Sequence, residues 1–469
     1  MKTKMDRREF LKRTALIGAG TAAASLLNAC APAATATQAP AATAAPAATT
    51  APAATVAKAV FDWKRFKGEK IEALLIKNTV GDLLVKYQKE FEDLTGITVG
   101  ADTPAEQQQR QKLAVEFQSG QTSFDVVYYS FHVQKRLFGK NKWVADVREY
   151  LNDPTMVAPD WDWNDFSAAG KAWSTEADGR IDAVCNKIDY FILYCNKDIF
   201  AAKGVALPKT YDDVVAAAQK LHDPAKNIFG FAGRGLKNAN TILWTSMLLG
   251  WDMDAIDAKL NLNTTSAEAV ECAKFYQNLQ KNYAPPGVAG FNWNECQSAF
   301  AQGQLAMWWD GLGFATPLED PKTSKVVGKV AYVVAPKGPK AQWAGMTGDG
   351  MGVSSFSKKK GPAWYYCMWA ASKQMQARTL AAGAGSPPRN SAYADADALK
   401  SLVVPKDWVD SVTGSGKIGR ATLPVIVPVT EFRDIFGVAL TNMIGGADAA
   451  TELKKATDEF KPILEKSEK

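Results

Sequence analysis

Short apolar runs alternate with longer amphipathic stretches from about residue 60 onward. Ile71 to Ile76 is an apolar run of strand length, and a polar turn at Lys77 to Gly81 follows it. The next stretch repeats large apolar residues at helical spacing, at Leu84, Tyr87, Phe91 and Leu94. This spacing predicts an amphipathic helix, and Gly96 is the residue type that commonly ends one.

The same alternation continues for three more segments. Ile97 to Val99 has the pattern of a strand, Glu106 to Ser119 that of a helix, and Phe124 to Tyr129 that of a buried strand. Strands that alternate with helices predict an α/β fold whose parallel sheet is covered by helices. Ligands of such sheets bind beyond the carboxyl ends of the strands. We therefore expect Asn78 and Tyr129, which lie at two such ends, to line a binding site.

The later chain repeats this mixture without an internal repeat. Arg180 to Asn196 alternates like two paired strands around Asn186-Lys187. Thr210 and Asp213 have the spacing of a capping box and predict the start of a helix. Further helices are expected at Ser266–Lys281, Asn294–Gln302 and Ala447–Leu464, and a further strand at Val326–Val334.

The N-terminal segment, residues 1–29, has the pattern of an export signal. Basic residues open an apolar run, Thr14 to Ala29, that is too short and too rich in Ala and Gly to span a membrane. Asp6 to Lys12 resembles a twin-arginine signal, and Leu27 to Cys30 resembles a lipoprotein processing box. We expect residues 1–29 to be a signal peptide and Cys30 to be lipidated. The protein would then be held in the cell envelope, on the outer side of the cytoplasmic membrane.

The segment after Cys30 predicts a tether. From Ala31 to Ala59, every residue except Gln38, Val56 and Lys58 is Ala, Pro or Thr. Repeated Pro interrupts helices, and no large apolar side chain is present to build a core. We expect residues 30–59 to be a linker and the folded part to begin near Phe61.

Composition excludes several classes of function. The chain has a net charge of +6, and four of these charges belong to residues 1–29, so the remainder is nearly neutral and no nucleic-acid partner is indicated. His132 and His222 are the only histidines, which argues against a His-built metal centre and a Ser-His-Asp hydrolase. Thr413 to Ile418 resembles a phosphate loop but lacks the first Gly and the Ser/Thr. We predict no metal, no cofactor and no catalytic residues.

Five cysteines remain after Cys30, at Cys185, Cys195, Cys272, Cys296 and Cys367. The number is odd and no C-x-x-C occurs, so at least one thiol stays unpaired within the chain and no redox pair is indicated. We expect most of them to be small buried residues. A Cys272–Cys296 disulfide is the alternative.

Motifs in a fixed order resemble the extracellular solute-binding proteins of ATP-driven importers, in the branch that includes maltose-binding protein. Thr95 to Val99 resembles the family's "TGI-V" segment, and Tyr194 to Phe200 resembles its "YNKDLF" block. Ala299 to Met307 is similar to "aF..GkaAM", and Gly385 to Arg389 to a late loop that ends in Pro-Pro-Arg. Cys195 departs from the family's usual Tyr, and Cys185 stands where a Pro often marks the hinge.

This resemblance implies a two-lobed α/β protein of the type II periplasmic-binding-protein-like fold, whose lobes close on a ligand. The first lobe would comprise residues 60–187 and 312–345, and the second residues 188–311 and 346–469. A monomer would deliver its ligand to the membrane permease subunits of an ABC importer.

A sugar or sugar alcohol presents apolar C–H faces, which suit aromatic rings, and a rim of hydroxyls. The hydroxyls suit carboxylates, amides and Arg. The resemblance places Asp189 at a lobe crossing, where maltose-binding protein has a ligand-contacting Glu, and Tyr129 and Arg389 at cleft positions. One of Trp308 and Trp309 must face the core if the strand alternates; we choose Trp309 to stack on the ligand, beside Asp310. Asn240, Trp244 and Asp349 complete the candidate set. Tyr129 and Trp244 could equally be core residues.

The sequence therefore predicts a lipid-anchored binding protein that captures a carbohydrate or polyol. A secreted carbohydrate-active hydrolase is one rival, but it needs two carboxylates at a defined separation, and no convincing pair stands out. A ligand-sensing partner of a signalling receptor is the other, and no sequence feature excludes it.

Overall fold

Eight strands and the helices around them are built from residues 60–469, the part of the chain that the computed structural model describes. The expected signal peptide, the lipidation site Cys30 and the linker lie outside these residues. No helix in the described part combines the length and the apolar character that a membrane crossing requires.

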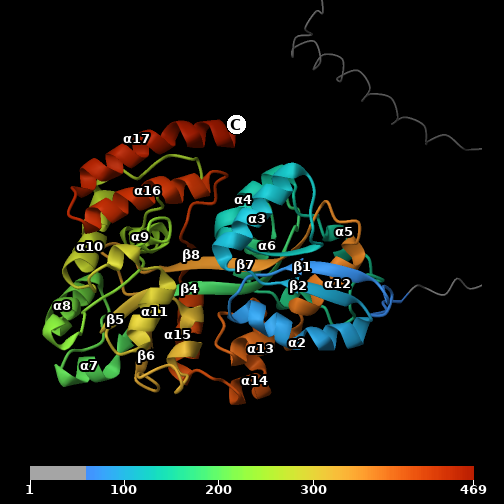
Figure 1. The fold of residues 1–469 in the computed structure, drawn as a ribbon, viewed down its shortest axis with the longest axis horizontal. Helices are drawn as coiled ribbons and strands as arrows, with labels where there is room; N and C mark the ends of the chain where they lie inside the picture. Colours follow the sequence, from blue (N-terminus) through green and yellow to red (C-terminus); the bar gives the residue numbers. More distant parts are fainter. Residues whose placement is uncertain (1–59) are drawn as a thin grey trace, which may run out of the picture. The chain divides into compact units, whose positions relative to one another are not determined.

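The strands form one continuous sheet in the order β2-β1-β3-β7-β4-β5, with β6 on β4 and β8 on β7 (Figure 1). The predicted parallel strands are β1 (Lys70–Leu74), β2 (Thr98–Asp102) and β3 (Val126–Ser130). β7 (Ala344–Val353) runs antiparallel to β3 and is paired by the short β8 (Gly419–Ala421). This arrangement confirms the α/β class.

One long strand, β4 (Val184–Asn196), links the two halves of the sheet. Its first half pairs with β7, and its second half pairs with β5 (Met307–Gly311) and β6 (Val330–Val333). The expected pair of strands around Asn186-Lys187 is therefore wrong. The polar residues there belong to an irregularity between Cys185 and Lys187, and the Asn186 amide donates to the carbonyl of Ala370 at 2.8 Å instead of forming a turn.

One group of helices packs around β1, β2 and β3, as Figure 1 shows on the side of the blue strands. The group comprises α2 (Thr79–Thr95), α3 (Glu106–Ser119), α4 (Phe131–Asn141), α5 (Arg148–Leu151), α6 (Ala168–Ser174), α12 (Lys360–Ala370), α13 (Lys373–Ala381) and α14 (Ala396–Lys400). Helix α2 ends as predicted, with Gly96 in the left-handed region at φ 71°.

A second group surrounds the other end of β4 (Figure 1). It comprises α7 (Lys197–Ala202), α8 (Tyr211–Leu221), α9 (Asn240–Leu248), α10 (Ala267–Asn282), α11 (Trp293–Ala301), α15 (Lys406–Lys417), α16 (Val429–Ile444) and α17 (Ala449–Glu468). The predicted capping box of Thr210 and Asp213 is present at the start of α8. Thr413 to Lys417 lies inside α15, which agrees with the rejection of a phosphate loop there.

The division into lobes expected from the sequence differs from the observed packing at two places. The expected first lobe includes residues 330–333, but β6 pairs with Leu193–Asn196, in the second half of β4. The expected second lobe includes residues 360–381, but α12 and α13 share a hydrophobic cluster with β1 and α2. The chain returns to the first group after β7 because the last residues of that strand pair with β3.

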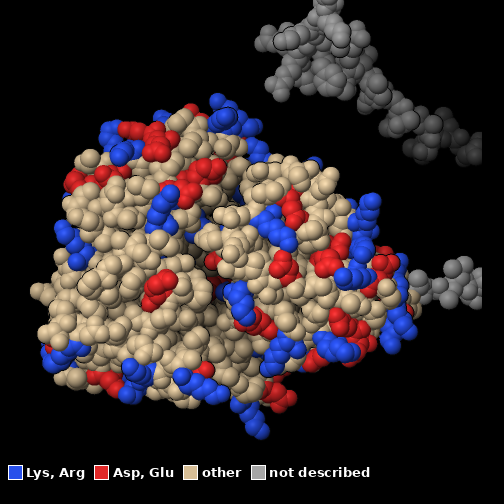
Figure 2. Space-filling model, in the orientation of Figure 1, with Lys and Arg blue, Asp and Glu red and all other residues tan. Residues whose placement is uncertain are grey.

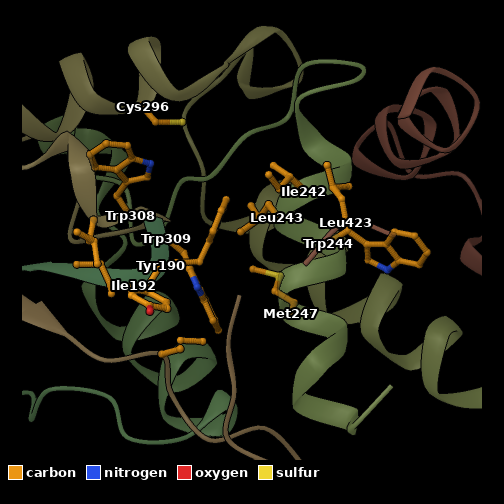
Figure 3. Packing of buried hydrophobic residues seen from close by; sticks show 14 of the residues in the cluster. Tyr190, Ile192, Ile242, Leu243, Trp244, Met247, Cys296, Trp308, Trp309 and Leu423 are labelled. Atoms are coloured by element: carbon orange, nitrogen blue, oxygen red, sulfur yellow. The ribbon is translucent and has the colours of Figure 1, made fainter. Parts of the chain in front are cut away.

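The apolar core is rich in tryptophan. Trp308 and Trp309 on β5 and Trp244 on α9 are all at most 1% exposed, and Figure 3 shows them among the packed side chains of β4, α9 and α11. Within residues 60–469 all five cysteines are buried and free, so the alternative Cys272–Cys296 disulfide is absent. The expectation of small buried thiols is confirmed.

Candidate functional site

A cavity of about 340 Å³ lies where β4 and β7 pass from one group of elements to the other. Figure 2 shows a hollow between the two groups, with acidic and basic side chains at its edge. The polar lining residues are Lys77, Asn78, Glu106, Gln107, Ser130, His132, Lys187, Asp189, Arg234, Asn292, Asn294, Thr347 and Asp349. The apolar lining residues include Phe191, Trp293 and Phe314.

Two carboxylates flank one ammonium group on the crossing strands. Lys187 Nζ lies 3.3 Å from Asp189 Oδ2 and 3.6 Å from Asp349 Oδ2, and all three side chains are nine-tenths buried or nearly so. Burial lowers the pKa of Lys187, but the charges of Asp189 and Asp349 outweigh it and leave the pKa raised. Burial also raises the pKa of Asp349, against the charge of Lys187. The backbone N–H of Gly313 donates to Asp189 Oδ1 at 3.0 Å, whereas Asp349 Oδ1 is buried with no partner in the described chain.

Arg234 is held rigidly at the opposite wall. Its Nε lies 2.9 Å from Asp310 Oδ2 and its terminal nitrogen 2.5 Å from Asp310 Oδ1, a planar two-bonded pair. The guanidinium carbon also lies 5.6 Å from the ring centre of Phe191 and 5.7 Å from that of Phe314. Asp310 is fully buried behind Arg234, so it fixes the cation rather than lining the cavity.

An aromatic pair forms one wall. The rings of Trp293 and Phe314 are stacked almost parallel, with centres 4.8 Å apart and planes inclined by 4°. Trp293 is the first residue of α11, whose capping box of Asn292 and Glu295 fixes the direction of this helix turn. The partly exposed indole is the flat apolar surface that a carbohydrate C–H face suits.

The start of α3 and of α4 contributes polar groups from the first group of elements. Arg110 forms an ion pair with Glu106 and donates to Ser130 Oγ at 3.3 Å. His132 Nδ1 lies 3.4 Å from the carbonyl oxygen of Gly348. Burial, and then the charges of Arg110 and Arg433, lower the pKa of His132 to about 3, so its imidazole is neutral at physiological pH.

Three of the predicted site residues line this cavity: Asn78, Asp189 and Asp349. Asn78 also caps α2, because its side-chain oxygen accepts from the N–H of Gly81 at 2.9 Å. The structure brings the three together from the turn after β1 and from within β4 and β7, so the strand-end rule for α/β sheets accounts for Asn78 alone.

The predicted tryptophan does not lie at the cavity. Trp309 is 1% exposed and packs edge-on against Tyr211, and its neighbour Trp308 stacks on Tyr194 at 4.7 Å. Strand alternation predicts that one of the two is available to a ligand. Both are in the core instead, because β5 is buried on both faces.

Four other predicted residues also pack away from the cavity. Tyr129 packs against Phe131 and Phe138. Trp244 stacks on Phe436, with ring centres 5.9 Å apart. Both are therefore core residues, the alternative that the sequence left open. The amide of Asn240 donates to the carbonyl of Gly437 at 2.9 Å, which ties α9 to α16. Arg389 is 1% exposed, pairs with Asp165 at 3.1 Å and lies against the rings of Trp161 and Phe166.

Sequence reasoning missed Lys187, Arg234 and Trp293. Asn292 and Glu295, three positions apart before an apolar run, carry a usable signal for the helix start that presents Trp293. Nothing in the local sequence distinguishes Arg234 from a surface cation, because its partner Asp310 is distant along the chain. Lys187 has one partner nearby in the sequence, Asp189, and one distant partner, Asp349.

Comparison with known proteins gives consistent matches. A sequence profile of bacterial extracellular solute-binding proteins matches residues 77–377. The erythritol/L-threitol-binding protein of Mycolicibacterium smegmatis is 24% identical over 473 residues, covering 96% of this chain and 95% of that protein. A probable amino-acid ABC transporter periplasmic-binding protein of Sinorhizobium fredii is 26% identical over 351 residues. The match covers 72% of this chain and 76% of that protein.

Similarity also extends to solved structures. The solute-binding protein of Agrobacterium radiobacter K84 in complex with ribitol matches with a TM-score of 0.77 at 25% identity, over 85% of this chain and 99% of that one. The fold predicted from the sequence, two lobes of the periplasmic-binding-protein type, is thereby confirmed.

Proposed function

Because the chain belongs to the bacterial extracellular solute-binding protein family, we propose that its cavity captures a small, uncharged polyhydroxy solute for an ABC importer. Capture is reversible: the two lobes close on the solute, and no covalent step takes place. The protein acts as a monomer that hands the solute to the membrane permease subunits. The observation that carries this proposal is the combination of a stacked aromatic wall with buried, charge-balanced polar groups.

The charges that line the cavity favour a neutral ligand. Lys77, Lys187 and Arg234 are balanced by Glu106, Asp189 and Asp349. Carboxylate oxygens can accept hydrogen bonds from hydroxyls, and a hydroxyl oxygen can accept from Lys187 or Arg234. A neutral polyol satisfies both kinds of group without leaving an unpaired buried charge.

The relatives favour a short ligand. Those that bind erythritol, threitol and ribitol take short sugar alcohols. The cavity, with about 340 Å³, is at the lower end of the usual range for small-molecule sites, about 300–1,000 Å³.

Thermal unfolding with a panel of solutes tests the proposal. A ligand that binds only the folded state adds stability with the logarithm of its concentration, about 2.7 kcal/mol at one hundred times its Kd. We expect tetritols, pentitols, hexitols or a monosaccharide to raise the melting temperature, and maltose and free amino acids to leave it unchanged. Stabilisation by amino acids alone would overturn the ligand class while leaving the solute-binding role intact. Cleavage of an oligosaccharide would overturn the non-catalytic role.

We further propose that lipid on Cys30 anchors the protein to the membrane. Support comes from the sequence, since a small-residue stretch that ends in Leu-Asn-Ala-Cys follows a twin-arginine signal. The variant Cys30→Ala should fold and bind solute normally but leave the membrane fraction after cell disruption. A variant that stays membrane-bound after a high-salt wash would contradict the anchor.

A further inference from the structure

The segment from Ala384 to Arg389 runs alongside the crossing strand, beside the cavity. The backbone N–H of Ile188 donates to the carbonyl of Ser386 at 2.8 Å, and the N–H of Ser386 donates back to the carbonyl of Ile188 at 2.8 Å. Ile188 lies between Lys187 and Asp189, so this exchange fixes the segment next to both charged side chains. The far end of the segment is anchored by Arg389, which is buried against Asp165.

Gly385 has a conformation and surroundings that suit no other residue. Its φ is 130°, in the region that favours glycine. A Cβ atom there would lie 2.6 Å from Cγ and 2.7 Å from Cδ of Lys187. The Lys187 stem therefore passes directly over the α-carbon of Gly385 on its way to the two carboxylates.

Asp189 is seated in a similar way from the other side. A Cβ on Gly311 would lie 2.8 Å from Asp189 Oδ2, and a Cβ on Gly313 would lie 3.1 Å from it. The backbone of this turn also donates to Asp189 through Gly313. Glycines on two separate segments, Gly385 on one and Gly311 and Gly313 on the other, thus leave room for the ion pair of Lys187 and Asp189.

We propose that Gly385 is a positioning residue for solute binding, which acts by letting Lys187 lie between Asp189 and Asp349. This inference rests on the proposed solute-binding function of the cavity. With Lys187 in that place, one cation lies within ion-pair distance of both carboxylates, and Asp349 Oδ1 is left free to accept from a ligand hydroxyl. A methyl group at position 385 would push the stem away, separate the charges and narrow the cavity.

A double-mutant cycle tests this coupling, with a sugar alcohol found by the solute panel as the probe. We expect Gly385→Ala to weaken binding at least tenfold, measured by calorimetric titration. Lys187→Ala should also weaken binding, and because it removes Cγ, Cδ and Cε, it removes the clash. The double variant should therefore bind no more weakly than Lys187→Ala alone.

Gly68→Ala is the matched control for backbone strain, because Gly68 has a φ of 91° and a Cβ added there would meet nothing within 4 Å. It should retain wild-type affinity even where its melting temperature falls. If Gly385→Ala fails to fold, the double variant should regain the folded state. A double variant that also fails to fold would show that the backbone alone requires glycine, and would overturn the proposal.

Two further results would contradict the role of Gly385 specifically. One is wild-type affinity in Gly385→Ala; the other is a double variant in which the two losses of affinity multiply. Failure of the solute-binding function itself looks different, since no sugar, polyol or amino acid would then bind the wild-type protein.

Discussion

Two tryptophans with similar local sequences have opposite environments at the scale of single residues. Trp293 opens α11 and lines the cavity, whereas Trp309 lies in a strand and packs in the core. Each precedes a polar residue, Asn294 or Asp310, so the neighbouring sequence alone does not separate them. The difference arises because one indole stacks on Phe314 at the cavity wall, whereas the other packs against Tyr211 of α8 inside the core.

This contrast predicts opposite effects of the two alanine substitutions. Trp293→Ala should reduce solute affinity by about thirtyfold, corresponding to about 2 kcal/mol, with little change in unliganded stability. Trp309→Ala should instead lower the free energy of unfolding by about 3–5 kcal/mol. Calorimetric titration and unliganded denaturation separate the two. Equal stability losses in both variants would remove Trp293 from the binding surface.

Asp182 provides a second prediction at this scale. It is fully buried, and neither carboxylate oxygen has a hydrogen-bond partner in the described chain. Burial, and then the charge of Glu176, raise its pKa to about 7, although Lys135 and Arg180 oppose the shift. Between about pH 4 and pH 7 the native state therefore holds a proton that the unfolded state has released, and stability falls as pH rises through this window.

The variant Asp182→Asn stays neutral and should escape that loss. Above pH 7 it should be more stable than the wild type, and near pH 4 the two should be equal. Denaturation at a series of pH values measures this. Exposed Asp178, replaced by Asn, serves as the control and should give no gain at high pH. A flat difference between Asp182→Asn and wild type across the range would contradict the buried, protonated carboxyl.

At the scale of elements, the periodic helices and apolar strands can be predicted from the sequence to within a few positions. Repeating apolar positions define α2 and α10, and a side-chain cap defines α8. Long-range pairing is harder to predict. Whether Asn186-Lys187 is a turn or an irregularity in β4 depends on β7, a strand from a distant part of the chain.

The same limit applies to the site. Asn78 is predictable because the end of a strand is a local feature, whereas Asp189 is predictable through the resemblance to the solute-binding family. The sequence misplaces Trp309 because the covering of both faces of β5 depends on elements far along the chain. Arg234 is not predictable at all, since only the fold brings it to Asp310.

The start of α8 yields a prediction for an element. Thr210 Oγ1 accepts from the N–H of Asp213, and Asp213 accepts from the N–H of Thr210 at 3.0 Å. Thr210→Ala should lower the free energy of unfolding by about 1 kcal/mol. Thr210→Ser should retain most of the stabilisation that the cap provides. Solute affinity should not change, because this cap is not part of the cavity lining. Denaturant titration with calorimetry checks both statements, and weaker binding in Thr210→Ala would link α8 to the site.

At the scale of the whole molecule, the cavity lies at the strands that join the two groups of elements. A solute held there contacts residues from both, such as Asn78 and Trp293. Binding energy can therefore shift the equilibrium toward conformations in which the groups approach each other, provided the solute binds those more tightly.

Solution scattering measures this movement directly. Adding a saturating concentration of the identified sugar alcohol should reduce the radius of gyration of a variant that starts at residue 60. The variant Trp293→Ala at the same solute concentration should show a smaller change, because fewer molecules are occupied. An unchanged scattering curve for the saturated wild-type protein would contradict closure as the transport signal.

The five buried thiols have a consequence for how this protein can be studied and handled. Burial raises the pKa of Cys195, Cys272 and Cys367, so in the native state these groups are protonated and shielded from reagents. Alkylation can occur only after local or global opening. Cys272 belongs to the hydrophobic cluster around β5 and α9, and Cys367 to the cluster around β1 and α12. The alkylation rates of Cys272 and Cys367 therefore report how fast each half of the protein opens, and no cysteine has to be added by mutation. Oxidants would crosslink only chains that have already opened.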